Sequence, residues 1–172
     1  AISILKEKNP SLEQSVQCLV IGSANSSKDK EYQESLVKLT HEHKLERIIQ
    51  FIPHQKDVRS LYKNSDILIQ ASIEAEAFGL VVAEAMIEKL FVIGPRLGGI
   101  RDILINNKTG LTFDSNNLSA PIELARIIDL ALSNKIDMTK MKENAYQLIT
   151  KHYTSDRTVS YTHLRAHETD SY

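Results

Sequence analysis

The sequence lacks a strong net charge of either sign. Its 172 residues carry 21 lysines and arginines against 22 aspartates and glutamates. A protein that binds nucleic acid or an acidic membrane surface through its overall field needs a clear excess of positive charge. This balance argues against nucleic acid as a partner, so local sites must define what the chain binds.

Cysteine is nearly absent, and no hydrophobic run is long. Cys18 is the single cysteine, so no disulfide can form within the chain, which agrees with a reducing, cytoplasmic setting. The longest apolar runs, such as 18–21 and 67–69, fall far short of the roughly 20 residues that cross a bilayer. The sequence also has no internal repeat and no Pro- or Gly-rich linker. We therefore expect one domain without a membrane span.

Short apolar runs alternate with helical patterns along most of the sequence. The runs are rich in β-branched residues and predict strands, whereas the segments between them space apolar residues at helical intervals. This alternation predicts an α/β fold with a Rossmann-like open parallel sheet and helices on both faces. The predicted strands lie within 16–23, 47–53, 66–72, 90–95 and 109–114, and the predicted helices lie before Asn9, within 30–44 and 57–64, from Gly79, from Gly99, and within 121–133 and 138–153.

The loops that follow the strands are the candidate binding regions. In open parallel sheets, ligands bind beyond the carboxyl ends of the strands, at a topological switch point. Four loops meet this condition here, at 22–29, 53–57, 71–79 and 94–99. Polar residues at regular spacings in these loops are therefore the candidate ligand contacts.

The loop at 71–79 carries the strongest candidate site. The stretch "ASIEAEAFGLVVAEAM" places Glu76 and Glu84 on either side of a Phe-Gly pair, and Gly79 opens a predicted helix. A helix start has unpaired N–H groups and a partial positive charge, both of which favour phosphate. Glu84 lies roughly 7 Å further along the helix, where a carboxylate could accept hydrogen bonds from two ribose hydroxyls. The alternative is that Glu76 only supports the helix dipole and Glu84 is a solvated position.

These residues resemble the E-x-F-G-x-x-x-x-E-A-M signature of retaining GT-B glycosyltransferases of the family-4 type, also called glycosyl transferases group 1. The segments "LVIG", "LYKNSDILIQAS", "GGIRD" and "TGLTF" also occur in the order of that family. The resemblance covers Ala1 to about Tyr153 and implies the C-terminal, donor-binding half of a GT-B fold. The signature is matched by Glu76, Phe78, Gly79, Glu84, Ala85 and Met86.

The resemblance implies a role for each site residue. Glu76 would be the catalytic residue, contacting the transferred hexose near the reacting carbon, with hydroxyl recognition as its default role. The backbone of Phe78, Gly79 and Leu80 would meet the phosphate and sugar of the donor, and Glu84 would bind its ribose. Such enzymes use a UDP- or GDP-sugar, retain the anomeric configuration and need no metal or other cofactor. The acceptor, a glycan or a lipid-linked group, is not identified.

Two features depart from the family pattern. The stretch "IEKLFVIG" places Lys89 and Phe91 where the family has Gly and Pro, and Asp102 replaces the more usual glutamate after the Gly-Gly pair. These changes affect the turn after the helix and the sheet more than the donor contacts.

A further departure from the family pattern concerns the positive charges that face the diphosphate. In the family, an Arg and a Lys from the first strand and loop of this domain face the diphosphate, and those would lie before Ala1. Lys89, Arg96 and Arg101 are candidate substitutes, although each is also explained as a surface charge. We therefore expect a donor-binding domain over 1–157 that is truncated at its N-terminus and does not catalyse transfer alone. The absent acceptor-binding domain would allow a peripheral contact with the inner face of a membrane.

Two other classes of function remain open. One is a non-catalytic module that binds sugar nucleotides, which "EKLF" in place of the family's Gly-Pro turn favours. The other is a nucleotide-sugar epimerase on a GT-B scaffold, which would need further carboxylate and histidine residues for proton transfer. The histidines at 41, 43, 54 and 152 are scattered along the sequence.

The C-terminal residues differ in character from the rest. "VSYTHLRAHETDSY" has neither helical nor strand periodicity, and its first part matches the translation of a transposase-type sequencing-library adapter. His163 and His167, four residues apart with Glu168 beside them, have the spacing of a helical metal site. We nevertheless expect 158–172 to be a non-native tail and assign it no function.

Overall fold

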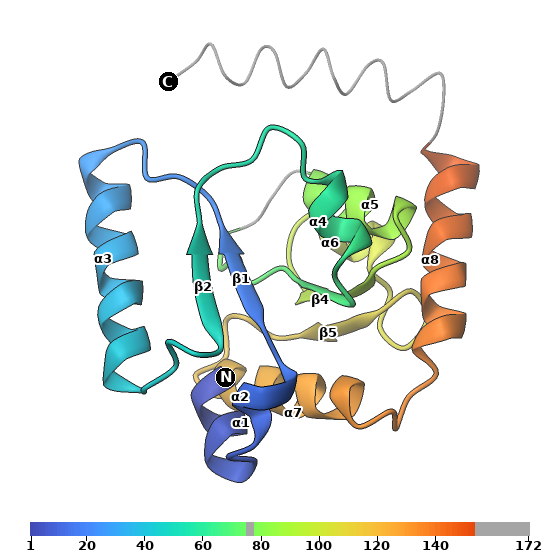
Figure 1. The fold of residues 1–172 in the computed structure, drawn as a ribbon. Helices are drawn as coiled ribbons and strands as arrows, with labels where there is room; N and C mark the ends of the chain where they lie inside the picture. Colours follow the sequence, from blue (N-terminus) through green and yellow to red (C-terminus); the bar gives the residue numbers. More distant parts are fainter. Residues whose placement is uncertain (75–77, 154–172) are drawn as a thin grey trace. The chain divides into compact units, whose positions relative to one another are not determined.

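The computed structural model describes residues 1–74 and 78–153, which fall into two compact units (Figure 1). The first unit contains 1–58 and 121–129, and the second contains 59–120 and the described residues from 130. Glu76 and the predicted non-native tail at 158–172 lie outside the described residues. Whether 1–157 form one domain therefore stays a prediction.

The first unit is built around a parallel pair of strands. Cys18 is opposite Ile49 and Ile21 is opposite Ile52, as two of the predicted strand segments require. The helix between the two strands, α3, begins with a capping box. In it, Ser26 and Asp29 each accept a hydrogen bond from the other's backbone N–H. The elements are α1 (Ile2–Lys8), α2 (Leu12–Ser15), β1 (Cys18–Ile21), α3 (Ser27–Glu42) and β2 (Ile49–Ile52).

The second unit holds three parallel strands in the order β3-β4-β5. All five residues of the middle strand are buried, which explains why "FVIGP" is apolar throughout. The elements of this unit are α4 (Arg59–Lys63), β3 (Ile67–Ile69), α5 (Leu80–Ile87), β4 (Phe91–Pro95), α6 (Ile100–Ile103), β5 (Leu111–Phe113) and α8 (Met138–His152), and α7 (Ala120–Leu132) has residues in both units.

Helices α5, α6 and α8 pack against β4, and α8 also packs against α5 and α6. Val82, Ala85 and Met86 of α5 are fully buried, as is Ala145 of α8. This packing fixes the start of α5 relative to the end of the sheet. The core therefore holds in place the loop that carries the candidate site.

The structure confirms the predicted α/β class. All five predicted strands form, every strand pair is parallel, and helices lie between the strands along the chain. The strands hydrogen-bond as two sheets, one of two strands and one of three. None of the helices in 1–74 and 78–153 is long and apolar enough to cross a membrane.

One short helix was not predicted. Helix α2 follows Asn9-Pro10, where we expected only the end of the first helix. The Asn9 side chain accepts hydrogen bonds from the backbone and hydroxyl of Ser11, at 3.2 and 2.7 Å, and Leu12 is 4% exposed. An Asx turn at Asn9 therefore leads into α2, and the buried side chain of Leu12 anchors this short helix. Four residues are too few to produce a detectable periodicity in the sequence.

Candidate functional site

Gly79 caps the start of α5 in a backbone conformation that favours glycine. Its φ and ψ angles are 77° and 55°, in the left-handed region. A Cβ atom added to Gly79 would lie 2.6 Å from Cγ1 of Ile100, the first residue of α6. The missing side chain thus lets the starts of α5 and α6 lie close together. Because glycine has no side-chain oxygen, it offers no acceptor to the first N–H groups of α5.

Two of the four candidate loops lie next to each other at this end of the second unit. They follow β3 and β4, which are neighbours in the sheet, with Ile69 opposite Ile93. The backbone N–H of Gln70 continues the pairing by donating to the carbonyl of Ile93 at 2.9 Å. The structure therefore brings the starts of these two loops together, after Gln70 and after Pro95. The other two loops, at 22–29 and 53–57, belong to the first unit.

Glu84 lies on a half-buried face of α5. It shares that face with Leu80 and Glu88, one turn before and one turn after it, and all three residues are partly exposed. The hydroxyl of Tyr62, a buried residue of α4, donates a hydrogen bond to Oε2 of Glu84 over 3.4 Å. Glu84 is therefore a partnered carboxylate rather than a fully solvated one, contrary to the alternative that its sequence position left open.

A second contact joins α4 to α5. Nε of Arg59 lies 3.8 Å from Oε1 of Glu88, one helical turn beyond Glu84. Along α4, Arg59 precedes Tyr62, whereas along α5 Glu88 follows Glu84. The two contacts therefore place α4 beside α5 in the antiparallel direction, with Tyr62 at the end nearer the helix start.

Phe78 is held by an aromatic contact with the last helix. Its ring centroid lies 5.3 Å from that of Tyr153, with the planes tilted by 53°. Tyr153 directly follows α8, whose body packs on α5. The residue before Gly79 is thus fixed by packing, so the backbone at the helix start is positioned by two different elements, α6 and α8.

Lys89 does not supply a positive charge to the helix start. It follows the other end of α5, and its Nζ atom lies 2.9 Å from Oε2 of Glu143 and 4.5 Å from the centre of the Tyr146 ring. The hydrogen bond to Glu143 raises the pKa of Lys89 and lowers that of Glu143. The idea that Lys89 replaces the family's diphosphate-binding cations is therefore wrong.

Lys89 also occupies a position whose geometry favours glycine. Its φ angle is 58°, and the chain turns there through hydrogen bonds from Lys89 N to Met86 O and from Leu90 N to Ala85 O. Such a left-handed residue after a helix is most often Gly. The family's Gly thus matches the backbone, whereas the side chain of Lys89 here contacts Glu143 and Tyr146.

The two arginines near the site differ in position. Arg96 directly follows β4, and its backbone N–H donates to the carbonyl of Phe113 at 2.8 Å. Arg101 lies within α6, and its Nε atom donates to the carbonyl of Gly98 at 3.4 Å. Both residues are exposed. Arg96 is the better candidate for a phosphate contact because it lies at the carboxyl end of a strand, on the loop that leads to Gly79's neighbour Ile100.

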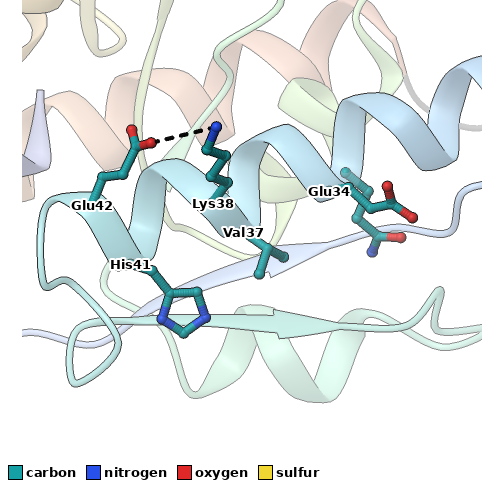
Figure 2. Close-up of a pocket in the computed structure, with 6 residues that line it drawn as sticks. Glu34, Val37, Lys38, His41 and Glu42 are labelled. Carbon is teal, nitrogen blue, oxygen red and sulfur yellow. Dashed lines mark ion pairs between the residues drawn. The ribbon is translucent and has the colours of Figure 1, made fainter.

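A shallow hollow on α3 is separate from this site. The residues that line it belong to that helix, and Figure 2 shows the ion pair of Lys38 and Glu42 there. Nζ of Lys38 lies 3.8 Å from Oε1 of Glu42. His41, also at the hollow, lies 2.8 Å from Glu46. The hollow contains none of the candidate site residues. Among the residues that the structure describes, no three His, Cys, Asp or Glu side chains are grouped to hold a metal ion.

Sequence analysis did not identify Tyr62, Ile100 or Tyr153 as residues of this region. Each comes from an element distant in the chain and reaches α5 through tertiary packing, so no spacing pattern indicates it. The segment "LYKNSDILIQAS", noted for its order alone, contains Tyr62. A Leu-Tyr pair in a short helix was the one available signal.

Comparison with known proteins adds a family. The profile of the family described as "Glycosyl transferases group 1" matches residues 1–148. The trehalose synthase of Thermococcus litoralis is 36% identical over 102 residues, which are 58% of this chain and 24% of that protein. The chain thus spans about a quarter of the length of this relative.

Solved structures share the fold. The C-terminal domain of a glycosyl transferase group 1 family protein from Francisella tularensis has a TM-score of 0.74 at 27% identity, over 88% of this chain and 75% of that one. An Anabaena protein solved in complex with UDP-glucose has a TM-score of 0.76 at 21% identity, over 95% of this chain and 44% of that one. The architecture is thus that of the C-terminal half of a GT-B fold.

Proposed function

Because the chain belongs to the glycosyl transferases group 1 family, we propose that it binds a nucleotide-sugar donor at the start of α5. The protein that contains it then transfers the sugar to an acceptor, a glycan or a lipid-linked group, with retention of anomeric configuration as in the family-4 type. The setting is cytoplasmic, with any contact to the inner face of a membrane made through an N-terminal domain.

The position of Glu84 relative to Gly79 carries this proposal. A diphosphate at the bare helix start would accept from the first N–H groups of α5, next to the backbone of Phe78 and Leu80. Glu84 lies about 7 Å further along the axis, on the same face as Leu80. That distance suits the ribose of the same nucleotide. Its carboxylate has free acceptor capacity for two hydroxyl groups besides the bond from Tyr62.

The remaining roles follow from the same arrangement. Glu76, in the loop before Phe78, recognises the transferred sugar and is the proposed catalytic residue. Arg96 faces the diphosphate from the loop after β4. The Anabaena protein of this fold was solved with UDP-glucose, which makes a UDP-sugar the first donor to test. No metal or other cofactor enters the proposed chemistry, since leaving-group charge is stabilised by the helix start and nearby cations.

The alternative of a non-catalytic module has lost its support. It depended on "EKLF", but Lys89 lies at the end of α5 that is remote from Gly79 and is explained by its contacts there. The epimerase alternative needs further carboxylate and histidine residues at the site. His152, the last residue of α8, belongs to the second unit, and its ring lies 6.4 Å from that of Tyr153, so this alternative stays open. Transfer remains the function that the site supports best.

Replacing Glu84 tests the proposal directly. Glu84→Ala should raise the Kd for UDP or GDP about tenfold or more, because it removes charge-assisted hydrogen bonds to the ribose. Titration calorimetry of the purified protein with each nucleotide measures this. Glu143→Ala is the control, since it removes a carboxylate of the same unit that pairs with Lys89, at the end of α5 remote from Gly79, and it should leave Kd within about twofold. Equal effects of the two substitutions, or no binding of either nucleotide, would contradict the proposal.

A further inference from the structure

We propose that Tyr62 is a positioning residue for Glu84, fixing its carboxylate in the orientation that accepts both ribose hydroxyls of the donor. The inference rests on the proposed function and extends it to α4, an element outside the glutamate motif. Tyr62 acts through Glu84 and does not touch the nucleotide itself.

The first support is the burial of the tyrosine. Tyr62 is 8% exposed, and its hydroxyl is directed to Oε2 of Glu84. A buried phenol hydroxyl normally has a hydrogen-bond partner, and here a partner lies on the face of α5 that carries the candidate site. The contact couples a core residue to a half-exposed carboxylate.

The second support is the way in which α4 is held. The pair of Arg59 and Glu88 ties the same two helices together one turn away from the pair of Tyr62 and Glu84. The two contacts run in antiparallel register along α4 and α5. The hydroxyl of the buried Tyr62 therefore approaches Glu84 from α4, the side from which Arg59 approaches Glu88.

The chemistry of a carboxylate explains why this matters. The last torsion of a glutamate side chain has a broad preference, so a free Glu84 would sample many orientations. Two adjacent hydroxyls on a ribose require one orientation. A donor on Oε2 restricts the torsion, and the remaining lone pairs of both oxygens stay available for the ribose. The 3.4 Å separation is long for an O–H···O bond, so we expect the contact to shorten when nucleotide binds.

The test compares ribose-dependent binding in Tyr62→Phe and wild type. The probes are UDP and 2′,3′-dideoxy-UDP, together with the corresponding guanosine nucleotides, and Kd is measured by calorimetry. Tyr62→Phe should raise the Kd for the ribonucleotide about threefold to tenfold, the range of one hydrogen bond. It should leave the Kd for the dideoxynucleotide unchanged within about twofold. A purely structural role would weaken both probes equally.

Two controls make the result decisive. Tyr146→Phe removes a phenol hydroxyl from the same unit while keeping the ring beneath Lys89, and it should change neither Kd. In the background of Glu84→Ala, adding Tyr62→Phe should have no further effect, because the residue on which it acts is absent.

The possible failures are distinguishable. If Glu84→Ala loses ribose-dependent affinity but Tyr62→Phe keeps it, or if Tyr62→Phe weakens both probes equally, the positioning role is overturned and the proposed function stands. If wild-type protein binds neither UDP nor GDP, the proposed function is overturned and this inference with it.

Discussion

At the scale of single residues, the candidate site depends on a position where one added carbon atom would clash with a neighbouring side chain. Gly79 has a left-handed backbone and no room for a Cβ atom beside Ile100. Lys89 has a similar φ angle although it carries a side chain, and that side chain contacts Glu143 and Tyr146. The sequence indicates Gly79 through its place before a helix. The lysine is explained only once its partners on α8 are known.

We predict that Gly79→Ala lowers the free energy of unfolding by about 2 to 4 kcal/mol, from the left-handed backbone and from overpacking against Ile100. Urea unfolding followed by circular dichroism measures this. Gly22→Ala is the control, because no atom lies within 4 Å of a Cβ atom built there and its backbone is not left-handed. A loss as large in Gly22→Ala would contradict the explanation.

The substitution at Gly79 also bears on binding. Gly79→Ala should weaken UDP binding, because the added methyl group and any backbone shift disturb the helix start. Unchanged affinity for UDP in titration calorimetry would contradict a role of this helix start in binding.

At the scale of elements, local sequence patterns predicted where the strands lie, but they did not predict which helices contact each other. Parallel strands are commonly apolar throughout, so the fully buried "FVIGP" and the partly buried "ILI" are recognisable without knowledge of their partners. Helix α2 was missed because four residues show no period. The pairing of α4 with α5 was missed because Tyr62 and Glu84 are separated by 22 residues, and no periodicity connects separate helices.

Helix α3 supplies a pH-dependent prediction. Two hydrogen bonds with Ser26 lower the pKa of Asp29. The bond from the Ser26 backbone has the larger effect, and the bond with the Ser26 side chain has the smaller one. A carboxyl group whose pKa is lower in the folded than in the unfolded protein stabilises the folded state above the unfolded value of about 3.9. That contribution is lost as the pH falls through the folded pKa.

Asp29→Asn should therefore be less stable than wild type at pH 6 to 7, and the difference should shrink below about pH 4. Thermal unfolding from pH 7 to pH 3 measures it. A difference in stability that stays constant over this range would show that the charge of Asp29 contributes nothing through the capping box.

At the scale of the whole chain, the structure contains two compact units with different relations to the proposed function. The candidate site residues from Phe78 to Glu84, together with Tyr62, all belong to the second unit. The hollow on α3 belongs to the first. Binding should therefore change the dynamics of a defined part of the chain.

Hydrogen exchange with and without UDP should locate that part. We predict slower exchange in peptides covering α4 and the start of α5, because the bound nucleotide occupies the N–H groups of the helix start and stabilises the contacts around Glu84. Peptides covering α3 should exchange at the same rate in both conditions. Protection confined to α3 would place the nucleotide at the hollow of Figure 2 and refute the proposed site.

The sequence by itself determined the α/β class, the five strands, the helix start at Gly79 and the glutamate motif, because burial and backbone geometry impose local patterns on composition. Only the tertiary structure decided that Glu84 is partnered, that Lys89 turns towards α8, and that Ile100 and Tyr153 fix the approach to α5. These contacts join side chains from separate elements, and their geometry arises from packing around β4. No spacing along the chain records such packing, so a candidate site could be proposed from the sequence but its supporting residues could not.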